Sequence, residues 1–153
     1  MSRAPIGQYP HIRLSHHLGA NQSVGSVTHH YTLTPIGIPR PAEGEATGEV
    51  VCSECGGVET YRVLNERSAR AWRRLWLVLM LASFAIMGLS IGYVTVNGDQ
   101  PIDGDETVID LVIVGLFGGF VVGLILWNFW WYEDGVRGPG RFFRRPHGLK
   151  LPK

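Results

Sequence analysis

The sequence predicts an all-α membrane protein. We expect a two-helix transmembrane hairpin with a small, loop-rich N-terminal cytoplasmic region that contains short β-strands. Two stretches of 22 residues contain no charged side chain. Only 18% of the 153 residues are charged, whereas about a quarter is usual in a soluble domain. The segment between the two stretches carries five acidic residues and no basic one, and basic residues flank the pair of stretches. This pattern excludes an ordinary soluble domain and a long disordered chain.

The two uncharged stretches are residues 75–96 and 111–132. As helices, each would be about 33 Å long, which is enough to cross a hydrocarbon core of about 30 Å. Neither stretch has the polar face that a buried helix of this length normally has in a soluble protein. We therefore predict two transmembrane helices, joined by an acidic loop over residues 97–110.

Basic residues predict the orientation of this hairpin. Five arginines precede the first helix within residues 51–74, six basic residues follow the second within residues 133–153, and the loop has none. Lys and Arg are retained on the cytoplasmic side, so we expect a multi-pass cell-membrane protein with both termini in the cytoplasm. Basic and aromatic side chains at the helix ends should contact the lipid bilayer at headgroup level. The residues concerned are Arg73, Arg74, Trp76, Trp130, Trp131, Arg141, Arg144 and Arg145.

Small residues predict where the helices pack, because close backbone approach drives association in lipid. In an antiparallel hairpin, the small residues of the two helices would meet at matching depths, and we expect this intramolecular pairing. In the alternative, the glycine face of the second helix packs on another copy or another subunit. The residues are Ala85, Gly88 and Gly92 in the first helix and Gly115, Gly119 and Gly123 in the second.

Residues 1–50 are rich in Pro and Gly, which predicts a largely irregular region with a linker at residues 39–49. Short strands are expected at residues 31–38, 49–52 and 58–64, the last because apolar and polar side chains partly alternate there. A region of this size with few large apolar side chains would be only marginally stable alone.

Both cysteines lie in one motif, Cys52-Ser53-Glu54-Cys55-Gly56-Gly57. This motif resembles a zinc-ribbon knuckle, which implies a tight turn that aims two thiolates at one metal ion. Structural Zn²⁺ takes four ligands, so two more are needed. The candidates are His29 or His30 and His16 or His17, with one from each pair, because adjacent strand residues point to opposite faces. A second knuckle from another chain is the alternative.

Two further interpretations of the cysteines remain open. The thiols could lie unligated in a surface turn, or they could form a redox pair. The redox interpretation is the weaker one, because Gly56 and Gly57 oppose the helix that lowers a thiol pKa in thioredoxin-like sites. We expect His11 and His147 to be solvated side chains.

No catalytic or nucleotide-binding motif is present, and neither uncharged stretch holds an ionisable residue at depth. We therefore expect no enzyme, no small-molecule substrate and no nucleic-acid partner. The prediction is a membrane-anchored accessory subunit of a larger membrane complex, with structural zinc as its cofactor. A self-assembling protein, which resembles two-span phage holins in topology and basic tail, and a thiol or metal sensor are the alternatives. The preference for Arg over Lys, twelve to two, is typical of G+C-rich bacterial genomes.

Overall fold

A computed structural model describes residues 5–97, 106–138 and 147–151. The chain forms two compact units: residues 1–72 together with 132–153, and residues 73–131. The expected headgroup contacts of Arg141, Arg144 and Arg145 lie outside the described residues, as does most of the acidic loop.

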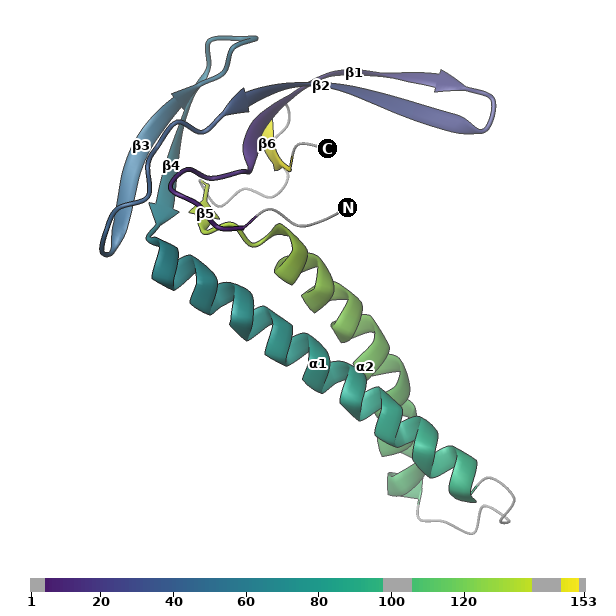
Figure 1. The fold of residues 1–153 in the computed structure, drawn as a ribbon. Coiled ribbons are helices and arrows are strands. Elements are labelled where there is room, and N and C mark those ends of the chain that lie inside the picture. The colour runs from purple at the N-terminus through teal and green to yellow at the C-terminus, as the bar shows by residue number, and fades with distance from the viewer. Residues whose placement is uncertain (1–4, 98–105, 139–146, 152–153) are drawn as a thin grey trace. The chain divides into compact units, whose positions relative to one another are not determined.

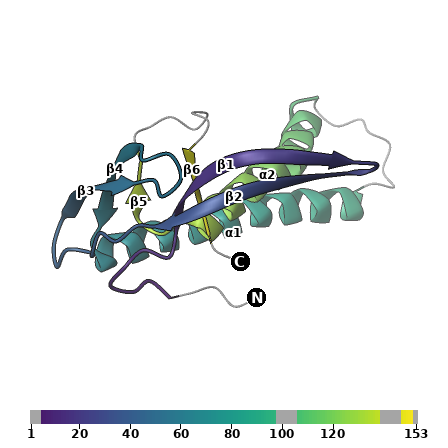
Figure 2. The same cartoon turned by 90° about the horizontal axis from the view of Figure 1, so that it is seen from above.

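The first unit is built from β-strands. One sheet consists of β1 (Arg13–Ser23), β2 (Ser26–Pro35) and β6 (His147–Lys150), in the order β2-β1-β6. All its pairings are antiparallel, and β6 pairs only with residues 13–16 of β1. The long β1–β2 hairpin therefore extends beyond β6 (Figures 1 and 2). This sheet joins a strand from near the start of the chain to a strand from near its end.

The second sheet repeats this arrangement. It contains β3 (Glu45–Val51), β4 (Val58–Leu64) and β5 (Val136–Arg137), in the order β3-β4-β5 and again antiparallel. A small hydrophobic core draws on strands and loops from both ends of the chain. Its buried members are Ile12, Leu14, Ile36, Val50, Cys52, Tyr61, Val63 and Val136.

The predicted all-α class is therefore only partly right, because the described residues contain six strands in two sheets. Gly19, Pro35 and Gly48 lie within β1, β2 and β3, so the Pro and Gly content of residues 1–50 does not prevent strand formation. The strand expected at residues 31–38 overlaps the end of β2, whereas β1 and the first half of β2 escaped prediction for a physical reason. Residues 20–30 are exposed on both faces, so they lack the alternation of apolar and polar side chains that marks a half-buried strand.

A buried ion pair fixes the point where the chain leaves the second helix. Arg40 Nη2 lies 2.9 Å from Asp134 Oδ1, and these side chains are only 2% and 3% exposed. Arg40 also donates to the carbonyl oxygens of Gly7 and Leu64. Asp134 Oδ2 accepts hydrogen bonds from the backbone N–H groups of His11 and Ile12. Burial lowers the pKa of Arg40, and the carboxylate of Asp134 opposes that shift.

Besides the strands, the chain forms two long helices: α1 (Glu66–Asn97) and α2 (Glu106–Tyr132). Asn65 caps α1, because its Oδ1 accepts a hydrogen bond from the backbone N–H of Ser68 at 2.7 Å. Both helices are long and apolar enough to cross a membrane. Many of their large apolar side chains are exposed, whereas a core helix of a soluble protein would bury them. Examples are Val78, Leu81, Leu89, Leu111, Val114 and Phe117.

Within the second unit the helices run side by side in opposite directions (Figure 1). A Cβ atom on Gly119 would lie 2.8 Å from the carbonyl oxygen of Ser83, and one on Gly123 would lie 2.6 Å from the ring of Phe84. A Cβ on Gly115 would meet the hydroxyl of Ser90. The glycines of α2 therefore pack against α1 of the same chain.

The small residues of α1 do not complete the expected pairing. Gly88 and Gly92 have open space where a Cβ atom would be. The glycines of α2 instead meet a face of α1 that carries Ser83, Phe84, Met87 and Ser90. The positions of small residues along the two helices thus predicted which face of α2 makes the contact, but not which face of α1. The reason is that the depth of a residue in the hairpin does not specify how the helix is rotated about its axis.

Candidate metal centre

The Cys-x-x-Cys motif forms a tight turn between β3 and β4. The backbone N–H of Cys52 donates to Gly57 O at 2.8 Å, and that of Gly56 donates to Cys52 O at 3.0 Å. Gly56 has a φ of +66°, in the left-handed region that favours glycine. Gly57 N–H donates to Cys55 Sγ at 3.4 Å. The turn leaves Cys52 buried and Cys55 exposed, and both thiols are free.

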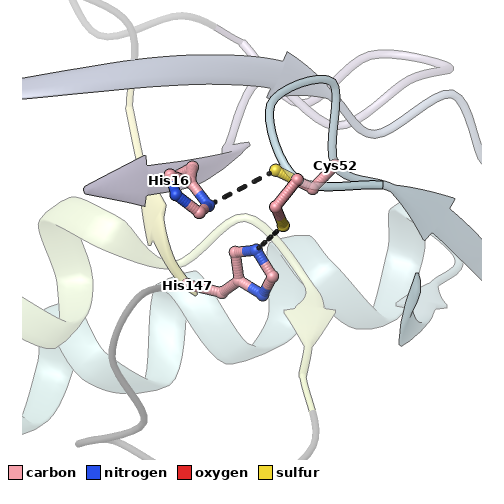
Figure 3. A group of neighbouring side chains, drawn as sticks. His16, Cys52 and His147 are labelled. Carbon is pink, nitrogen blue, oxygen red and sulfur yellow. Dashed lines mark hydrogen bonds between the residues drawn. The ribbon is translucent and has the colours of Figure 1, made fainter. Parts of the chain in front are cut away.

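Two histidines reach this turn from the other sheet. His16 of β1 and His147 of β6 are directly paired in the antiparallel register. Side chains at such positions are near neighbours, and the two imidazole rings lie edge to face with centroids 5.1 Å apart. His16 Nδ1 is 3.6 Å from Cys52 Sγ, and His147 Nε2 is 3.2 Å from Cys55 Sγ. Figure 3 shows His16, Cys52 and His147 gathered at this point.

The four donor atoms of His16, Cys52, Cys55 and His147 all lie within 4.8 Å of one another. Zn–S bonds of about 2.3 Å and Zn–N bonds of about 2.0–2.1 Å would place tetrahedral donors roughly 3.3–3.8 Å apart. The observed contacts of 3.2 and 3.6 Å are close to those separations. Two thiolates and two imidazoles also form a ligand set typical of structural zinc. The four residues could therefore hold a metal ion, and their donor types and spacing are compatible with zinc.

The surroundings of His147 suit a metal ligand. Its Nδ1 lies 3.0 Å from Glu59 Oε1, so the carboxylate occupies one ring nitrogen and Nε2 is directed at the thiols. Metal-binding histidines usually have such a carboxylate or carbonyl partner on the second nitrogen. Burial acts to lower the pKa of His147, but the hydrogen bond to Glu59 and the charge of Cys52 outweigh it, and the pKa is raised.

Cys52 is held in a form that can bind metal. Burial alone would raise the pKa of its thiol. Hydrogen bonds from the backbone of Cys55 and Glu54, with smaller contributions from the side chains of Cys55 and His147, lower the pKa to about 6. The thiolate is the metal-binding form of cysteine, and a lowered pKa favours that form.

The structure brings Cys52 and Cys55 together with His16, one of the two alternatives in its predicted pair. It places His29 and His30 elsewhere on β2, where His29 Nδ1 lies 3.1 Å from His17 Nε2. The fourth member is His147, which we had expected to be solvated. It lies 92 residues from Cys55, so no local spacing pointed to it. The only available signal was the short alternating run that follows it, Gly148-Leu149-Lys150-Leu151. Neither a protein-family model nor a curated protein nor a solved structure matches this chain.

Proposed function

We propose that this protein is a small integral membrane protein with a zinc-stapled β-rich module, and that it serves as an accessory or interaction subunit of a larger membrane complex. The observation that carries the proposal is the convergence of His16, Cys52, Cys55 and His147 donor atoms within 4.8 Å. Four protein ligands would complete a tetrahedral shell and leave no open position for a substrate. The zinc would therefore be structural.

A zinc ion at this position would stabilise the β-rich unit. Among the described residues, its hydrophobic core has eight buried members, which is a small core for a unit assembled from two distant parts of the chain. His16, the cysteine turn and His147 come from three separate segments, and β6 contributes only four residues to its sheet. Zinc binding would supply free energy that such a core lacks.

The arrangement of the first unit also supports the expected topology. Its sheets pair β1 with β6 and β4 with β5, so chain from before α1 and chain from after α2 fold together. Two membrane-spanning helices between these segments would return the chain to the side where it started. The basic flanks support a cytoplasmic location for that side, and thiols in the cytoplasm stay reduced and available for metal.

The β1–β2 hairpin offers a surface for a protein partner. Residues 20–30 are exposed, and no Asp, Glu, Lys or Arg occurs between residues 14 and 39. Charged side chains are a common means of blocking strand addition at a sheet edge, and residues 14–35 of this hairpin have none. This uncharged part of the hairpin, which extends beyond β6, therefore suits docking to a partner protein.

Metal analysis of the full-length protein, purified in mild detergent, tests the proposal. We expect one zinc per chain, and loss of that zinc in Cys52→Ser and His147→Ala. His30→Ala is the matched control, because His30 is an exposed histidine outside the group, and it should keep its zinc. Wild-type protein without stoichiometric zinc would contradict the zinc module. Co-purification in the same detergent tests for the partner complex.

A thiol sensor is the second candidate function, favoured by two free cysteines in one turn whose sulfur atoms lie within 4.8 Å of each other. Peroxide would oxidise the two thiolates to a disulfide, be reduced to water, and so release the metal. Zinc release that tracks disulfide formation at low peroxide, and reverses on addition of a dithiol reductant, would favour this function. Zinc that resists peroxide would favour the purely structural role.

A further inference from the structure

A second pair of histidines lies on the face of β1 opposite to His16. Adjacent strand residues point to opposite faces, so His16 and His17 diverge. His17 pairs with Tyr31 across the hairpin, and His29 lies two residues from Tyr31 on the same face. A register shift between His17 and Gly19 then opposes Ala20 to His29. The ring centroids of His17 and His29 are 5.3 Å apart, and each ring also contacts Tyr31.

The geometry of this pair suits chelation. His17 Nε2 and His29 Nδ1 are 3.1 Å apart and directed at each other. A metal ion about 2.0–2.1 Å from each nitrogen would see them at an angle of about 95–100°. That angle matches neighbouring positions of a square-planar or octahedral ion more closely than the corners of a tetrahedron. Imidazole is a good ligand for copper and nickel, which adopt those geometries.

We propose that His17 and His29 form a second, exposed metal site for a divalent ion of the copper or nickel class. The pair is accessible, since His29 is exposed and His17 is half-buried. The remaining coordination positions would be filled by water or by a donor from a partner. Two cationic residues flank the pair: Arg13 lies four residues before His17 on β1, and the ammonium of Lys150 lies 2.9 Å from the centroid of the Tyr31 ring. Their charges oppose cation binding, so we expect a modest affinity.

This site shares no ligand with the cysteine–histidine centre, which uses His16, Cys52, Cys55 and His147. The two sites would lie back to back on β1, one partly enclosed and one at the surface. The enclosed site has thiolates and a complete tetrahedral set, whereas the surface site has only two nitrogens. Tightly held structural zinc and a weakly bound, exchangeable second ion can therefore coexist on one chain.

The test uses full-length, zinc-loaded protein in detergent and Ni²⁺ as the probe, because Ni²⁺ does not oxidise thiols as Cu²⁺ does. We expect one Ni²⁺ per chain by calorimetry, without release of zinc. His17→Ala and His29→Ala should each weaken Ni²⁺ binding by roughly tenfold to a hundredfold, because the second ligand acts at high effective concentration. His30→Ala, an exposed histidine next to His29, should leave the affinity unchanged.

Three results would overturn this proposal: unchanged Ni²⁺ affinity in His17→Ala, equal weakening in His30→Ala and His29→Ala, or displacement of zinc by Ni²⁺. Folding does not confound the comparison, because zinc content and circular dichroism are measured on each variant. The hypothesis of a zinc centre would be contradicted by a different result, the absence of zinc from the wild-type protein. The tests of the zinc centre and of the His17–His29 site are therefore distinguishable.

Discussion

The helical pair and the β-rich unit of this protein are organised by different physics. Each helix satisfies its backbone hydrogen bonds within a continuous segment, and its apolar side chains are exposed, as a lipid environment requires. The β-rich unit depends on pairings between distant segments, such as β1 with β6 and β4 with β5. Its core is small, and its buried Arg40 and Asp134 form an ion pair. Loss of the pairings between distant segments should therefore unfold the β-rich unit, whereas the two helices should keep their structure.

Removal of the proposed zinc ion should produce the largest effect and distinguish the two units most clearly. A structural zinc contributes about 10 kcal/mol or more to folding in small zinc domains. A strong chelator, or Cys55→Ser, should remove the protection of backbone amides in β6 and in residues 13–16 of β1. Amide hydrogen exchange in detergent measures this loss. The amides of α1 and α2 should keep their protection, and their loss in parallel would contradict the independence of the two units.

Loss of the buried ion pair should have the next largest effect. Asp134→Ala leaves the guanidinium of Arg40 buried without its carboxylate, which costs about 3–5 kcal/mol. The free energy of unfolding of zinc-loaded protein measures the change. Glu45→Ala is the control, because Glu45 and Arg62 form an exposed ion pair worth at most about 1 kcal/mol. Equal losses in the two variants would mean that Asp134 does not hold the unit together.

A leucine in the helix contact should have a smaller effect, confined to the other unit. Gly119→Leu would place a side chain where even a Cβ atom lies 2.8 Å from Ser83 O, so α1 and α2 must separate. Overpacking of this kind costs about 1–3 kcal/mol. Thermal unfolding in detergent and crosslinking between the helices measure it. Gly88→Leu should have little effect, because Gly88 faces open space, and both variants should keep their zinc.

Alkaline pH should have the smallest effect and act only on the β-rich unit. Burial, with the charges of Glu59 and Cys52, raises the pKa of Tyr61 to about 12. The folded state therefore holds a proton that the unfolded state loses near pH 10, so stability falls as the pH rises from about 10 to 12. Tyr61→Phe should remove this part of the loss in thermal unfolding. Tyr9→Phe, at an exposed tyrosine, should not change it.

Several elements could be predicted because their causes are local. The apolar stretches needed only composition and length, since a backbone in lipid has few structures other than a helix. The turn at Cys52 and Cys55 followed from a short motif with Gly56 at the required left-handed position. The strand over Val58–Leu64 is likewise a consequence of neighbouring residues, because apolar and polar side chains partly alternate there.

The other ligands could not be identified in this way, because strand register decides them. A shift of one residue in β1 or β2 would exchange His16 for His17 at the metal centre, since side chains alternate between faces. His147 reaches the centre only because β6 pairs with residues 13–16, on the far side of two long helices in the sequence. The order of residues along the chain thus specified the helices and the cysteine turn, whose interactions lie within a few residues. Long-range strand pairing alone decided which histidines join the cysteines, because it sets both the register and the face of every side chain.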